Sequence, residues 1–174
     1  MRISVSVYQP VDTKMNFNEG DRVVHKKFGV GIVVSIEGMN LSGNGHSLYY
    51  RVDFSKTTVW VPVSNQSEGL RLITPKSHLY RYRALLKSSP VSIDGDFHKR
   101  RSELEKRIDR GTFKGLCEVI RDLNGRNAEK PLNYYEKTLL KRTREALISE
   151  WSITSGVSRS ETIDEINGCL EHRK

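Results

Sequence analysis

The stretch RVVHKKFGVGIVVSI, residues 22–36, holds two runs rich in valine and isoleucine on either side of a glycine-bearing segment. Short runs of β-branched residues bounded by turn formers are typical of β-strands. The segment FGVG, residues 28–31, favours a tight turn with a bulge over a phosphate-binding loop, because a strand and not a helix follows it. The stretch therefore predicts two strands joined by a tight turn.

Three further runs continue the strand pattern toward residue 73. They lie at residues 47–54, 58–63 and 70–73, and turn formers stand at residues 40–45 and 55–56. Five short strands in so few residues cannot form a large sandwich, and they suit a small, strongly bent five-stranded barrel of the SH3 or Tudor type. Pro62 has no amide donor, so its strand should be an edge strand or leave the ladder there.

Beyond residue 73 the apolar spacing changes to that of α-helices. Five helices are expected, and each has a starting signal: Thr74 with Pro75, Asp96, Thr112, Asn133 with Glu136, and Ser158 with Glu161. The sequence therefore predicts an α+β protein of two domains. A small β-barrel should span residues 15–73 and an all-α five-helix bundle residues 74–174, while residues 1–14 should form a flexible extension.

The charge of the chain is unevenly distributed between these two domains. The net charge is +8, from 29 Lys and Arg against 21 Asp and Glu. Residues 1–73 contribute +2 (8 against 6) and residues 74–174 contribute +6 (21 against 15). A polyanionic partner therefore belongs more naturally to the helical domain. The alternative is a well-solvated basic surface without such a partner.

Residue types that carry catalysis do not occur in productive patterns. Cys117 and Cys169 are far apart in sequence, and none of the five histidines stands at ligand spacing from another His or Cys. The chain has no phosphate-binding loop and no nucleophile elbow. We therefore expect a non-enzymatic protein without cofactor or metal. Because it has neither a membrane-length apolar run nor a credible signal peptide, we expect it in the cytoplasm.

Nucleic-acid binding has a better signal, at the expected start of the second helix. The sequence FHKRR, residues 97–101, places one aromatic ring beside several cations. Cationic side chains can contact phosphates, and an exposed aromatic can enter between base steps. The alternative is that Phe97 packs into the bundle with Leu104, seven residues away on the same helix face.

Several segments resemble the CarD/CdnL family of bacterial transcription factors. In the first half the resemblance lies in FNEGDRVVHKKFGVG, residues 17–31, and in residues 36–37, 49–54, 61–63 and 69–71. The transcription-repair coupling factor has a matching module. In the second half, residues 97–101, Gly111, 118–123 and 136–137 resemble the helical domain of CarD/CdnL. The resemblance spans roughly residues 15–170, and it suggests that Met15 is the usual start.

The resemblance implies that the first domain docks on the β subunit of RNA polymerase, by strand addition at a sheet edge. Carried onto this sequence, the contact residues are Ile36, Met39, Thr58, Val59, Trp60 and Val61. Met39 and Trp60 stand where some relatives have arginines. Trp60 is either an exposed hot spot of binding or a core residue.

The resemblance also implies that the helical domain binds promoter DNA at the upstream edge of the transcription bubble. There an aromatic residue inserts in the minor groove, with little dependence on sequence, and stabilises the open complex. The matching positions are Phe97, Lys99, Arg100 and Lys137, with Arg101 added as a neighbour. We expect a monomer, associated with the nucleoid through the polymerase. The alternatives are a polymerase-bound adaptor that recruits a protein, with Phe97 buried, and a nucleic-acid chaperone without a polymerase role.

Overall fold

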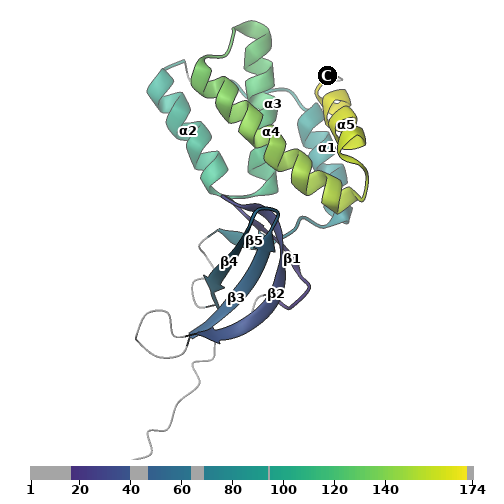
Figure 1. Cartoon of the computed structure of the whole chain (residues 1–174). Coiled ribbons are helices and arrows are strands. Elements are labelled where there is room, and N and C mark those ends of the chain that lie inside the picture. The colour runs from purple at the N-terminus through teal and green to yellow at the C-terminus, as the bar shows by residue number, and fades with distance from the viewer. Residues whose placement is uncertain (1–16, 40–46, 64–68, 94, 172–174) are drawn as a thin grey trace, which may run out of the picture.

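The computed structural model describes residues 17–39, 47–63, 69–93 and 95–171, in which a β-sheet precedes a group of helices (Figure 1). The strands are β1 (Arg22–His25), β2 (Gly29–Met39), β3 (Ser47–Phe54), β4 (Thr57–Pro62) and β5 (Leu70–Leu72). The helices are η2 (Lys76–His78), α1 (Leu79–Lys87), α2 (Phe97–Asp109), α3 (Phe113–Glu129), α4 (Tyr134–Ser155) and α5 (Arg159–Glu171). The predicted extension at residues 1–14 and the turn at residues 40–45 lie outside the described residues.

The five strands form one antiparallel sheet in the order β4-β3-β2-β1-β5. The prediction of five strands before a group of helices is confirmed. Among the described residues no ladder joins β4 to β5, so closure of the predicted barrel is not confirmed. The two end strands are short, and β4 ends at Pro62, which cannot donate to a further ladder. The prediction that the strand of Pro62 lies at an edge is confirmed.

Glycine is required where β2 passes β3. A Cβ on Gly31 would lie 2.7 Å from a ring carbon of Phe54 and 2.8 Å from the carbonyl oxygen of Asp53. Further along β2 the register shifts between Val33 and Ser35, which bends the strand. The sheet is curved as a result, and its inner face buries an apolar core that includes Val23, Val33, Tyr50 and Val52.

A histidine side chain holds the turn between β1 and β2. His25 Nδ1 accepts hydrogen bonds from the backbone amides of Lys27, at 3.0 Å, and Phe28, at 3.3 Å. Burial and the neighbouring charges of Lys26 and Lys27 lower the pKa of His25 below its ordinary value. The folded state therefore favours the neutral imidazole, which keeps the lone pair that the turn needs.

We expect the free energy of unfolding to decrease as the pH is lowered through the range where histidine in the unfolded chain becomes protonated. Folding lowers the pKa of His25, so in this range the unfolded state binds more protons than the folded state. The stabilisation that the neutral His25 contributes is therefore present above about pH 6.5 and is lost as the pH falls below that value. Urea unfolding between pH 7.5 and 5.5 measures the slope. His25→Asn keeps an acceptor near the same position and should flatten that slope. An equal slope in the variant would assign the effect to other groups.

Four of the five predicted helix starts are confirmed. Asp96 accepts from the Lys99 amide at 2.9 Å and Thr112 from the Gly115 amide at 3.1 Å. Reciprocal hydrogen bonds between cap and third residue join Asn133 to Glu136 and Ser158 to Glu161. Thr74 was predicted wrongly: Pro75 precedes η2, and the Thr74 hydroxyl donates to Glu150 Oε1 instead, at 2.7 Å.

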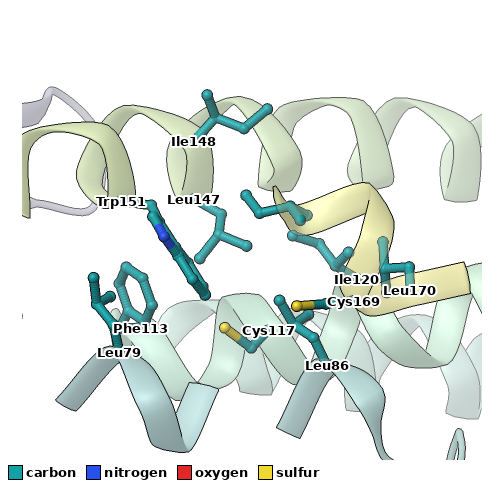
Figure 2. Packing of buried hydrophobic residues seen from close by; sticks show 11 residues of the cluster. Leu79, Leu86, Phe113, Cys117, Ile120, Leu147, Ile148, Trp151, Cys169 and Leu170 are labelled. Atoms are coloured by element: carbon teal, nitrogen blue, oxygen red, sulfur yellow. The ribbon is translucent and has the colours of Figure 1, made fainter. Parts of the chain in front are cut away.

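The main core of the helical domain lies between α1, α3, α4 and α5. Figure 2 shows the fully buried Trp151 indole beside Phe113 and Leu79, with Cys117 and Leu147 next to it. The indole Nε1 donates to Glu165 at 3.0 Å, so the one polar atom of the ring has a partner. A second cluster around Leu104 and Leu123 packs α2 against α3 and α4.

The two domains meet through a buried carboxylate on α4. Glu150, 1% exposed, accepts two hydrogen bonds from the Arg71 guanidinium, at 2.7 and 2.6 Å. It also accepts from the amide of Thr74, at 3.0 Å, and from its hydroxyl. Arg71 Nε donates to the carbonyl of Gly111 at 2.6 Å, on the turn after α2. This network joins the β domain to the helical domain.

Candidate functional site

Phe97 is the first residue of α2 and lies at the surface. Its side chain is 37% exposed, whereas Leu104 on the same helix is fully buried. The Phe97 ring lies edge-on to the ring of Tyr135 on α4, with 6.3 Å between centroids. The structure therefore places Phe97 outside the core, against the alternative that it packs with Leu104.

Three of the predicted cationic residues are exposed at the starts of α2 and α4. Lys99 follows Phe97 on α2, and Lys137 lies on the first turn of α4. Arg101 pairs with Glu105 at 2.9 Å and lies over the Tyr135 ring, 4.9 Å from its centroid. Arg101 therefore places a cation against the aromatic pair, and Lys99 and Lys137 add two exposed cations on the first turns of the same two helices.

Arg100 lies beneath this surface rather than on it, with its guanidinium carbon 5.9 Å from the centroid of the Phe97 ring. It is 4% exposed; its Nε lies 2.6 Å from Glu136 Oε1, and its Nη1 donates to the carbonyl of Gly95 at 2.9 Å. Burial alone would raise the pKa of Glu136, but hydrogen bonds from Asn133 and Arg100 hold it below its ordinary value. The expectation that Arg100 contacts a phosphate is therefore corrected, because its charge already pairs α2 with α4.

Sequence reasoning missed the tyrosine pair at the start of α4. Tyr134 is 86% exposed, the most of the exposed large hydrophobics in the described residues. Tyr135 supports Phe97 and donates through its hydroxyl to Glu105 Oε1 at 3.2 Å. The signal was available: two consecutive aromatics after a helix cap cannot both face the same core.

In the β domain the predicted polymerase contacts separate into two groups. Trp60 on the edge strand β4 is 40% exposed, and its Nε1 donates to Glu37 Oε2 at 3.1 Å, so the core alternative for Trp60 is wrong. Thr58 shares this outer face, and its hydroxyl donates to Asp53. Val61 is 8% exposed and belongs to the apolar core of the sheet, and the partly buried Val59 packs against that core.

The predicted β2 contacts are not direct neighbours of β4, because β3 lies between the two strands. Ile36 is partly buried and packs against the core, and Met39 is partly buried at the end of β2. The link between the two strands is instead the Glu37 side chain, which reaches across β3 to Trp60.

Two family models match the chain, one for each domain. The CarD-like/TRCF RID domain matches residues 17–74, and the CarD C-terminal domain matches residues 82–167. The chain belongs to the CarD family. The chain is also similar to a protein from Bacillus subtilis (strain 168) named "Putative transcription factor YdeB". That relative is 28% identical over 147 residues, which cover 83% of this chain and 96% of its own length.

CarD-family membership makes the protein a transcription-related factor associated with RNA polymerase. In the part of the chain that the structure describes, no helix could cross a membrane. The same residues contain no group of three or more His, Cys, Asp or Glu side chains placed to hold a metal ion.

Proposed function

We propose that this CarD-family protein stabilises the promoter open complex. The β domain would bind the β subunit of RNA polymerase through β4, and the helical domain would bind promoter DNA at the upstream edge of the bubble. The observation that carries the proposal is the exposed Phe97 ring at the start of α2, which is supported by Tyr135. Arg101 lies over the Tyr135 ring, and Lys99 and Lys137 are exposed on the first turns of α2 and α4.

An aromatic ring in this setting suits the minor groove of distorted DNA. Insertion of an apolar side chain unstacks a base step at a cost of a few kcal/mol, so it is favourable where the DNA is already opening. The flanking cations would contact phosphates without reading sequence. The adaptor alternative required a buried Phe97, and its 37% exposure removes that premise.

The polymerase half of the proposal rests on the free edge of the sheet. β4 pairs with β3 on one side, and no described strand covers its other side. An exposed edge can accept a strand from a partner, and Trp60 beside it supplies an apolar anchor. Val61 and Val59 would then contribute backbone hydrogen bonds rather than side-chain contacts.

Stabilisation by such a protein arises from differential binding. If it binds polymerase on melted DNA tenfold more tightly than on closed DNA, it shifts the equilibrium by about 1.4 kcal/mol and no more. Attachment to the polymerase raises the effective concentration of the helical domain near the DNA. A weak and salt-sensitive DNA contact is therefore sufficient.

We expect Phe97→Ala to shorten the lifetime of competitor-resistant open complexes on a weakly stable promoter by about tenfold relative to wild type, which corresponds to about 1.4 kcal/mol. Phe97→Trp should retain the lifetime, because it keeps a flat apolar ring. Tyr80→Ala is the matched control, since Tyr80 is an exposed aromatic on α1. If wild type binds polymerase and leaves the lifetime unchanged, the proposal is wrong for that promoter.

A further inference from the structure

A cavity lies between the two domains, at the far end of α2 from Phe97. Its volume is about 510 Å³. It is bounded by the turn between β1 and β2, the C-terminal end of α2 and the middle of α4. Figure 1 shows this end of α2 next to the sheet, where the helical domain stands on the β domain.

The charged groups of the cavity are mainly cationic. Lys26 and Lys27 come from the turn and Arg142 from α4, and all three are exposed. Arg71 is neutralised by Glu150, which leaves Asp109 as the remaining carboxylate of the lining. Among the described residues, no carboxylate forms an ion pair with Lys26, Lys27 or Arg142. The β domain therefore places two lysines on the same cavity as Arg142 of the helical domain.

This cationic end is continuous with the Phe97 surface. On α2, Phe97, Arg101, Glu105 and Ile108 follow each other at spacings of three and four residues, and Tyr135, Thr138, Arg142 and Ala146 do the same on α4. Arg101 pairs with Glu105, and the hydrogen bond from Arg101 together with the charge of Arg142 lowers the pKa of Glu105. Ile108, Arg142 and Ala146 line the cavity itself. A single strip thus runs from Phe97 across the domain boundary.

We propose that this strip carries the DNA backbone, and that Lys26, Lys27 and Arg142 contact phosphates of the duplex next to the step that Phe97 enters. The inference rests on the proposed function and extends its DNA contacts to the β domain. Twelve residues of α2 separate Phe97 from Asp109, about 18 Å at 1.5 Å per residue. That length matches about five base-pair steps at 3.4 Å each, so the backbone reaches the cavity without leaving the protein surface.

The test is the salt dependence of DNA binding by the full chain, measured by fluorescence anisotropy on a labelled fork-junction DNA. Lys26→Gln with Lys27→Gln should reduce the slope of log affinity against log salt by about 2, because each phosphate-contacting lysine contributes about 1. Arg142→Gln should reduce it by about 1. Glutamine keeps part of the aliphatic stem that Lys26 packs near Gly69. The matched control is Lys76→Gln with Lys87→Gln, exposed lysines on η2 and α1, which should leave the slope unchanged.

The outcomes separate this inference from the function on which it rests. If wild type shows a steep slope and the Lys26/Lys27 and Arg142 variants show the same slope, the extended path is wrong, but the proposed Phe97 contact is unaffected. A wild-type protein without salt-dependent binding to this DNA would overturn both. A slope reduced equally by the control pair would show diffuse charge attraction and would also refute the path.

Discussion

Replacing Glu136 by alanine is expected to destabilise the protein by about 3–5 kcal/mol, the usual cost of leaving a buried charge without its partner. Glu136 is 1% exposed, and its Oε1 lies 2.6 Å from Nε of Arg100 and 3.3 Å from Nε of Arg126. Its Oε2 accepts from the amide of Asn133 at 2.9 Å, which caps α4. The alanine would remove one of the two hydrogen bonds of this capping box and leave the buried Arg100 guanidinium without its carboxylate. Urea unfolding at neutral pH measures the loss.

A paired substitution separates the buried charge from the packing. Arg100→Met with Glu136→Gln removes both charges, and the glutamine can still accept from the Asn133 amide. We expect this protein to stay within about 1.5 kcal/mol of wild type, because replacing a buried pair is often close to neutral. Its open-complex lifetime should equal that of wild type if Arg100 is structural. A shortened lifetime in this folded variant would indicate that Arg100 contacts DNA after all. A decrease of less than about 1 kcal/mol in the free energy of unfolding of Glu136→Ala would contradict the expected cost of the buried charge.

Local signals predicted most of the fold correctly. The caps at Asp96, Thr112, Asn133 and Ser158 depend on residues within three positions of each other, and all four hold. Thr74 has the same local signal, yet its hydroxyl donates to Glu150, which is 76 residues away in sequence. A competing partner at that separation leaves no trace in a short window, so the sequence could not reveal it.

The candidate site shows the same division between local and distant information. Phe97 and Arg101 were found from a local pattern, and both are exposed. Arg100 lies between them and matches the pattern equally well, but its direction is set by Glu136, 36 residues further on. Closure of the sheet is also a matter of distant contacts. Strand count suggests a barrel, whereas closure depends on whether β4 and β5 are long enough to pair.

Glu150→Ala should uncouple the two domains as well as destabilise the protein. The substitution leaves the Arg71 guanidinium and the Thr74 hydroxyl without their shared acceptor. We expect a loss of about 3 kcal/mol, at the low end of the range for buried pairs, because the Arg71 side chain is 25% exposed and can regain some water. Urea unfolding gives this value. Glu150→Gln, which keeps the shape and one acceptor, should lose less.

The effect on open complexes should exceed what the loss of stability explains. If the protein docks through β4 as proposed, Phe97 reaches the DNA only when the angle between the domains is fixed. The hydrogen bonds of Arg71 to Glu150 and Gly111 hold that angle. With the network removed, the helical domain samples many orientations and the effective concentration of Phe97 at the DNA falls. At a temperature where Glu150→Ala is folded and binds polymerase as wild type does, we expect the open-complex lifetime to approach that of Phe97→Ala. A wild-type lifetime under those conditions would mean that the polymerase and the DNA, rather than the Arg71–Glu150 pair, set the angle between the domains.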